Sequence, residues 1–222
     1  MTTDQLSTKN ALIEAAGQLF ADLGFDGASI REIAKRANAN MAAIGYHFNG
    51  KENLYRETLR VVVNHKSHWS DAMLDALEQT QGGTPVPKAL KSVFRNRLDE
   101  LFGRDKPRWH IKLFIRALLE PSPALKEITQ ENLVGEFEAM CAAARAWNPA
   151  LTEAQAMRWT DAFFAQEIYY VLGQAVIQQM ANWDAYPGTY LDEIAAHVAR
   201  LQTAALWPDE LEAHIAQKEG GK

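Results

Sequence analysis

Apolar residues recur at helical spacing along most of the chain, and this pattern predicts an all-α protein. Leu12, Ala16 and Leu19 share one face of a first helix, which we expect over residues 8–23. Gly24 follows at the position where a C′ glycine would end that helix. No alternating stretch rich in Val, Ile and Thr predicts a strand. Further helices are expected between the prolines and glycines that interrupt the pattern at 82–87, 107, 121–123, 149, 187–188 and 208.

The segment 29–54 combines two short helical patterns, a turn and the start of a longer helix. Ser29 and Glu32 have the spacing of a capping box that opens the first short helix. Asn40 ends a three-residue turn and is a suitable N-cap for the second. A longer helix then begins at residue 51 and is expected to run to about Leu77. The pattern is that of a helix-turn-helix, whose exposed second helix can enter the major groove of DNA.

Two later helices have apolar faces that suit a dimer interface. The stretch 160–179 is apolar on more than one side, so it needs partners on several sides. One partner could be the same helix in a second copy of the chain; the alternative is a central helix buried within one chain. The amphipathic stretch 190–206 is expected to join the same interface. The polar tail, residues 208–222, is expected to fray.

Composition and charge fit a protein that contacts nucleic acid at one end. The net charge is −5, but residues 28–60 carry six cations and three anions, and the rest of the chain is correspondingly acidic. The single cysteine, Cys141, suits a reducing cytoplasm. The N-terminus lacks the basic start and apolar run of a signal peptide. The apolar-rich stretch 162–177 is too short and too polar to span a membrane, so we expect a cytoplasmic protein.

The N-terminal segment resembles the TetR family of bacterial transcriptional regulators over about residues 8–60. The matching residues are Ala11, Ala15, Phe20, Gly24, Ser29, Ile30, Ile33, Ala34, Ala37, Ile44, Tyr46, His47, Phe48, Lys51, Glu52 and Leu54. The stretch 120–125 also resembles the C-terminal domain of the CecR-like subgroup. The resemblance implies an all-helical homodimer. It also implies a DNA-binding domain over residues 1–50 and an effector-binding and dimerisation domain over 51–207.

The helix-turn-helix supplies the residues that we expect at DNA. They are Ser29, Arg31, Asn40, Met41, Ala42, Ala43, Gly45, Tyr46, His47 and Lys51. Tyr46, His47 and Lys51 suit phosphate contacts; packing within the small domain and an ordinary surface lysine are the alternatives. The family usually has Gly at position 38 and Tyr at position 45. The small residues on the exposed helix predict few bidentate base contacts, with more of the specificity falling on Asn40, Arg31 and DNA shape.

An effector pocket is expected where aromatic and polar residues share helix faces. The candidates are Trp109, His110, Phe114, Phe137, Cys141, Trp159, Phe163, Gln166 and Tyr170. Aromatic stripes of this kind are also typical of an ordinary core. His65, His68 and Asp71 have a spacing that could share a metal, but surface histidines on a long helix are the preferred interpretation. We expect no metal and no cofactor.

These patterns favour a one-component transcriptional regulator, most simply a repressor. Two recognition helices of a homodimer would bind a palindromic operator, and a small-molecule effector would favour a state that releases it. A helical enzyme is an alternative, although the chain has no G-x-S-x-G, H-E-x-x-H or Walker A motif. A structural dimerisation protein without a DNA role is another alternative.

Overall fold

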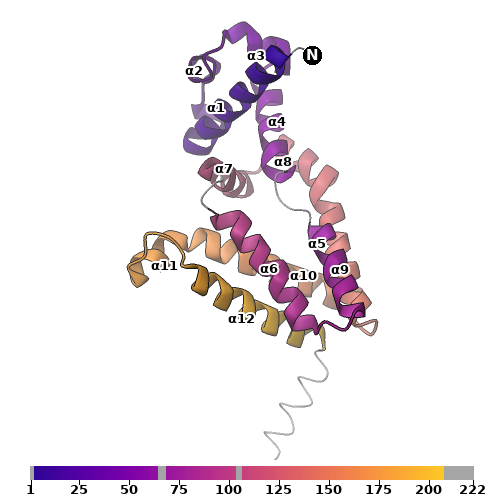
Figure 1. Cartoon of the computed structure of the whole chain (residues 1–222). Helices are drawn as coiled ribbons and strands as arrows, with labels where there is room; N and C mark the ends of the chain where they lie inside the picture. Colours follow the sequence, from indigo (N-terminus) through magenta and orange to yellow (C-terminus); the bar gives the residue numbers. More distant parts are fainter. Residues whose placement is uncertain (1–2, 65–68, 104–106, 208–222) are drawn as a thin grey trace, which may run out of the picture. The chain divides into compact units, whose positions relative to one another are not determined.

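The computed structural model describes residues 3–64, 69–103 and 107–207, and every regular element in these ranges is a helix (Figure 1). The chain folds into two compact units, and each unit is built from two separate stretches of the sequence. Unit 1 comprises residues 1–66 and 105–135, and unit 2 comprises residues 67–104 and 136–222. The predicted all-α class is therefore confirmed.

Unit 1 contains the helix-turn-helix and two helices from later in the chain. Its elements are α1 (Thr3–Gly27), α2 (Ile30–Arg36), α3 (Met41–Phe48), α4 (Lys51–Asn64), α7 (Arg108–Leu119), α8 (Pro123–Ile128) and a π-helical turn, η1 (Thr129–Leu133). The backbone of α1 breaks at Gly24, where φ is 75°. The predicted break at Gly24 is therefore confirmed, and the last residues of α1 lie beyond this kink, whereas the helix begins at Thr3 and not at residue 8 as expected.

The core of unit 1 forms where α7 packs along α1 (Figure 1). The Trp109 indole Nε1 donates to a carboxylate oxygen of Glu14 at 2.8 Å. The Arg116 guanidinium donates to the carbonyl oxygens of Ala21 and Asp22, at 3.3 and 3.4 Å, just before the kink. These are carbonyl groups that the helix itself leaves unpaired at its end. Thus α7 both covers the apolar face of α1 and caps it.

Unit 2 is a second helical bundle with its own core. Its elements are α5 (Trp69–Gln81), α6 (Val86–Phe102), most of α9 (Val134–Trp147), α10 (Glu153–Leu172), α11 (Gln174–Ala181) and α12 (Gly188–Leu206). Helices α6 and α12 pack side by side (Figure 1). The fully buried Phe94 and Phe163 contribute large side chains to the core between these helices and α10. Thr152 and Gln155 form a capping box at the start of α10.

Several predicted helix bounds differ from the structure. The helix expected over 51–77 is described as α4 to Asn64 and α5 from Trp69; residues 65–68, which include two of the metal candidates, lie outside the described residues. The stretch 160–179 forms two helices because the chain turns at Gly173, where a side chain would come within 2.9 Å of the Tyr169 carbonyl oxygen. The tail from residue 208 also lies outside the described residues.

Among the described residues, none of the helices combines the length and the hydropathy that a membrane crossing requires.

Candidate DNA-binding site

Two side-chain caps fix where the helices of the helix-turn-helix begin. Ser29 Oγ accepts a hydrogen bond from the Glu32 amide at 3.1 Å, at the start of α2. Asn40 Oδ1 accepts from the Ala42 amide at 3.0 Å, at the start of α3. Each cap satisfies a backbone donor that has no partner within its helix. Both predicted N-caps are confirmed.

The turn between α2 and α3 requires a left-handed residue, and Asn38 supplies it. Its φ is 50°, while the Ala39 amide reaches back to the Ala34 carbonyl at 2.9 Å. Asparagine tolerates this conformation better than most residues with a side chain, although glycine adopts it more readily. Asn38 therefore adopts the left-handed conformation at the position where the resemblance predicts glycine. Asn49 adopts the same conformation, with φ 56°, and ends α3.

The outer face of α3 is exposed and carries small side chains. The buried Ile44 and Phe48 fix its inner face to the core. On the other side Met41, Ala42 and Gly45 are exposed, whereas Ala43, which we also expected there, is partly buried and packs against the core. A Cβ placed on Gly45 would meet no atom within 4 Å, so the backbone there is open to a close approach. Another surface can therefore come nearer to α3 than large side chains would allow.

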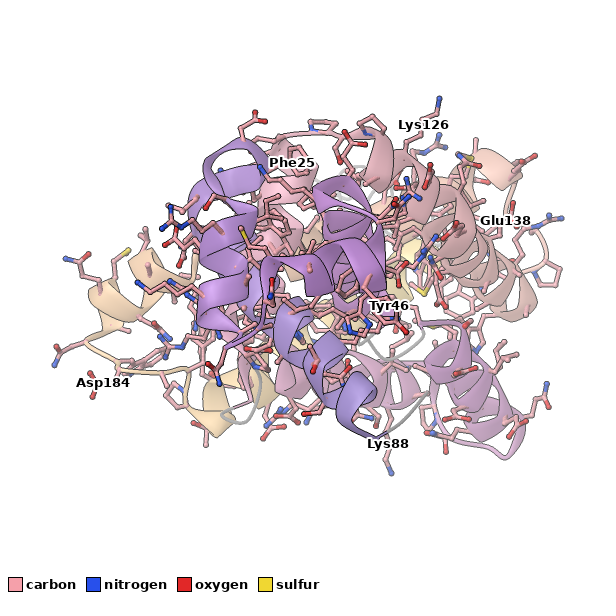
Figure 2. The ribbon with its side chains drawn as sticks, turned by 90° about the horizontal axis from the view of Figure 1, so that it is seen from above. Phe25, Tyr46, Lys88, Lys126, Glu138 and Asp184 are labelled. Carbon is pink, nitrogen blue, oxygen red and sulfur yellow. The ribbon has the colours of Figure 1, made fainter. Side chains whose placement is uncertain are left out.

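Tyr46 and His47 line a shallow concavity at the end of α3. Its volume is about 340 Å³, and Lys9 and Asn53 also line it. The Tyr46 ring is 74% exposed and stands edge-on to the imidazole of His47, with 4.9 Å between the ring centroids. Figure 2 looks down on this end of unit 1 and shows Tyr46 at its surface. The concavity gathers a phenol, an imidazole, two amides and an ammonium, which can all donate to phosphate oxygens. Arg56 and Glu57 also line it, and each is held in an ion pair, with Glu127 and with Arg60.

Lys51 begins α4, as predicted, but its ammonium has partners within unit 1. The Nζ atom lies 3.5 Å from the Asp26 carbonyl oxygen and 4.5 Å from the centroid of the Phe25 ring. These contacts hold the ammonium beside the end of α1. Arg31, by contrast, is exposed on the first turn of α2. Sequence reasoning missed Asn53, although its position one turn into α4 and its amide donors were visible in the sequence.

The residues proposed for an effector pocket fall into two different cores. Trp109 and Phe114, with His110 beside them on α7, belong to unit 1. The others belong to unit 2: Phe137, Cys141, Trp159, Phe163, Gln166 and Tyr170. Within unit 2, Trp159 and Phe163 are buried and in contact, Cys141 Sγ lies 3.3 Å from Thr160 Oγ1, and burial raises the pKa of Tyr170. The effector pocket itself stays a prediction.

Unit 2 also contains a buried ion pair that the sequence did not reveal. The Arg97 guanidinium donates to a carboxylate oxygen of Glu167 at 2.6 Å and to Glu100 at 3.0 Å. Arg97 is 2% exposed, and its guanidinium carbon lies 5.3 Å from the centroid of the Trp69 ring. The neighbouring carboxylates raise the arginine pKa against the effect of burial. Seventy positions separate the paired residues in the chain, so only the fold brings them together.

Comparisons with protein families agree with this arrangement. The family described as "Bacterial regulatory proteins, tetR family" matches residues 12–58. The description "HTH-type transcriptional dual regulator CecR, C-terminal domain" matches residues 87–206, which is more than half of the chain. The chain therefore belongs to the TetR family of transcriptional regulators and has a CecR-like C-terminal domain. The members of this family are HTH-type DNA-binding regulators, and the family is non-enzymatic.

Two individual relatives are also named as HTH-type transcriptional regulators. The chain is 52% identical over 132 residues to the "Probable HTH-type transcriptional regulator YttP" of Bacillus subtilis, covering 60% of each protein. It is 30% identical over 77 residues to the IcaR negative regulator of the icaADBC biofilm operon in Staphylococcus epidermidis, covering 32% of this chain and 42% of IcaR. These matches thus span less than two thirds of each relative's length.

A solved structure shows the shared fold. The transcriptional regulator from Rhodococcus sp. Rha1 superposes with a TM-score of 0.55 at 22% identity, over 87% of this chain and 94% of that one.

Proposed function

We propose that the chain is a homodimeric repressor that binds a palindromic operator and is released by a small-molecule effector. The observation that carries the DNA-reading part is the capped, exposed α3 with an open backbone at Gly45. Operator DNA lies in the bacterial cytoplasm, where we expect the protein to act. IcaR is named as a negative regulator, which supports repression as the direction of control.

The open face of α3 supports close approach to the floor of the major groove. The exposed Ala42 can contact thymine methyl groups, whereas hydrogen-bonded base readout would fall to Asn40 and Arg31. The concavity beside Tyr46 suits a backbone phosphate at the edge of the groove. Lys51 would leave Phe25 to reach a phosphate, or would stay there and act through its charge. The expected site therefore offers few side-chain hydrogen-bond donors to the bases, and its affinity should depend on DNA shape.

Exposed apolar side chains on α10 and α11 support a homodimer. Tyr169, Leu172, Val176 and Met180 are between 58% and 84% exposed on neighbouring turns of these two helices. Large apolar side chains gathered in this way usually mark an interface. In a twofold dimer the same residues would meet their own copies. Leu201 on α12, 48% exposed, lies in the second stretch expected at the interface.

The effector is expected in unit 2, where aromatic side chains surround a few polar groups. Phe137, Gln166 and Tyr170 are partly buried, so they are better placed than the fully packed Phe163 to meet a ligand. Binding there would change DNA affinity only through different affinities for the operator-bound and released states. No particular effector is assigned.

The DNA-binding part is tested by titrating fluorescent duplex DNA with the chain and with its Arg31→Ala variant. We expect affinity to fall steeply as salt rises, because bound cationic groups release counterions from DNA. Arg31→Ala should weaken specific binding about tenfold or more. Arg158→Ala, which removes an exposed arginine on α10, is the matched control and should change little. Equal affinities for the two variants would contradict the proposed role of Arg31.

The dimer is tested by sedimentation of the Val176→Lys/Met180→Lys variant. We expect the parent chain to sediment as a dimer and the variant as a monomer, because two lysines would meet two others across the twofold axis. Leu74→Lys changes an equally exposed apolar residue on α5 and should leave the dimer intact. A parent chain that is a monomer would overturn the proposal.

A further inference from the structure

Unit 1 contains a cavity that the proposed function does not use. Its volume is about 670 Å³, within the range of sites that hold drug-sized ligands. Its walls come from the kinked end of α1, the first turns of α4, the end of α7 and the connection to α8. We call it the α1–α4–α7 cavity. It lies wholly within unit 1 and is therefore separate from the effector site expected in unit 2.

Aromatic side chains form the apolar part of this cavity. Tyr55 is 6% exposed, and its ring meets the edge of Phe25 with 5.2 Å between centroids. The half-exposed Leu23, Pro121 in the α7–α8 connection and Pro123 at the start of α8 extend the same lining. Burial raises the pKa of Tyr55, against a smaller opposing effect of the neighbouring Ser122. The phenol therefore stays neutral, and the aromatic surface suits an apolar ligand body.

The charges around the cavity favour a cation. Two arginines line it, but Arg56 pairs with Glu127 at 2.9 Å and Arg116 pairs with Glu120 at 2.9 Å. Two exposed carboxylates, on Asp26 and Glu52, make no ion pair with any other residue that the structure describes. Lys51 adds one positive charge at the rim, over the Phe25 ring. The groups left without a counter-ion are thus negative overall.

From this combination we infer that the α1–α4–α7 cavity binds an organic cation with an apolar, aromatic-compatible body. The apolar body would lie against Tyr55 and Phe25, and its charge would lie near Asp26 and Glu52. Carboxylates and aromatic faces both attract cations, and both disfavour an anion of the same shape. The site is open to solvent through the exposed side chains of Asp26 and Glu52, so it does not require unit 1 to unfold.

The test compares two ions of the same shape and opposite charge by calorimetric titration of the full chain without DNA. Tetraphenylphosphonium should bind, and tetraphenylborate should bind at least about tenfold more weakly, since only the cation gains from the carboxylates. Equal affinity for the two ions would overturn the charge argument. Absence of heat with tetraphenylphosphonium at millimolar concentration would overturn the site.

Two variants locate the binding. Asp26→Asn/Glu52→Gln should weaken tetraphenylphosphonium about three- to tenfold, the range of exposed charge pairs acting together. Glu138→Gln/Asp184→Asn removes two exposed carboxylates of unit 2, labelled in Figure 2, and should leave the affinity unchanged.

Ala124→Phe should fill the cavity and abolish binding while the helical circular dichroism is kept. If the Asp26→Asn/Glu52→Gln variant binds like the parent chain, the cation lies elsewhere and the inference fails, whether or not the Ala124→Phe variant folds.

Discussion

Gly17 on α1 and Trp109 on α7 pack so closely that no side chain fits between them. A Cβ at position 17 would lie 2.3 Å from the indole Cζ3 atom. The indole is buried there and also bonds Glu14 from its nitrogen. A glycine in the middle of a helix normally lowers stability. At position 17 this loss is offset because the missing side chain lets α7 pack directly on α1.

Gly17→Ala should therefore destabilise unit 1, although alanine is the better helix former. The methyl group forces the indole or α7 to move, and overpacking of this kind costs about 1–3 kcal/mol. Urea unfolding followed by tryptophan fluorescence measures the change. An unchanged or increased stability would show that α7 does not pack on α1 in this way.

Gly45→Ala is the matched substitution and should have the opposite effect on stability. Its Cβ meets open space, so only the helix propensity changes, and the gain should be about 0.5–1 kcal/mol. DNA affinity should nevertheless fall, because the methyl group stands on the face that we expect to approach the groove. The same variant measured by urea unfolding and by DNA titration separates the two effects. Unchanged affinity would count against close backbone approach at α3.

Asn38 should respond differently to glycine and to alanine because its φ is positive. Asn38→Ala places a Cβ in a left-handed conformation without a polar side chain and should cost about 1 kcal/mol. Asn38→Gly should keep or slightly raise the free energy of unfolding. Equal effects of the two substitutions in urea unfolding would mean that the turn does not hold this conformation in solution.

The helix-turn-helix could be predicted because its signals are local. Caps such as Ser29 and Asn40 act within three residues, and glycine or asparagine at a positive φ ends a helix where it stands. The packing of α7 on α1 could not be predicted. Gly17 and Trp109 are 92 positions apart, and a glycine in a helix does not indicate which residue will pack against it. The same holds for Arg97 and Glu167. Periodicity shows which faces are apolar but not which core receives them.

Removing one partner of the buried Arg97–Glu167 pair should strongly lower the free energy of unfolding, whereas replacing both partners with apolar residues should lower it much less. Arg97→Met leaves the Glu167 carboxylate, 6% exposed, without its guanidinium, and should cost about 3–5 kcal/mol. The double variant Arg97→Met/Glu167→Met should recover most of that loss, because two apolar side chains need no counter-ion. Trp69 lies against the guanidinium and reports the unfolding by fluorescence. A double variant less stable than Arg97→Met alone would contradict this account.

The central claim is that α3 reads a specific DNA sequence, and selection from randomised duplex DNA at near-physiological salt tests it most directly. The purified chain is first unfolded, dialysed and refolded, so that no bound effector holds it in a released state. We predict recovery of an inverted repeat, with half-sites spaced for the two α3 helices of a twofold dimer. Recovery of fragments without any consensus from the refolded protein would contradict the claim.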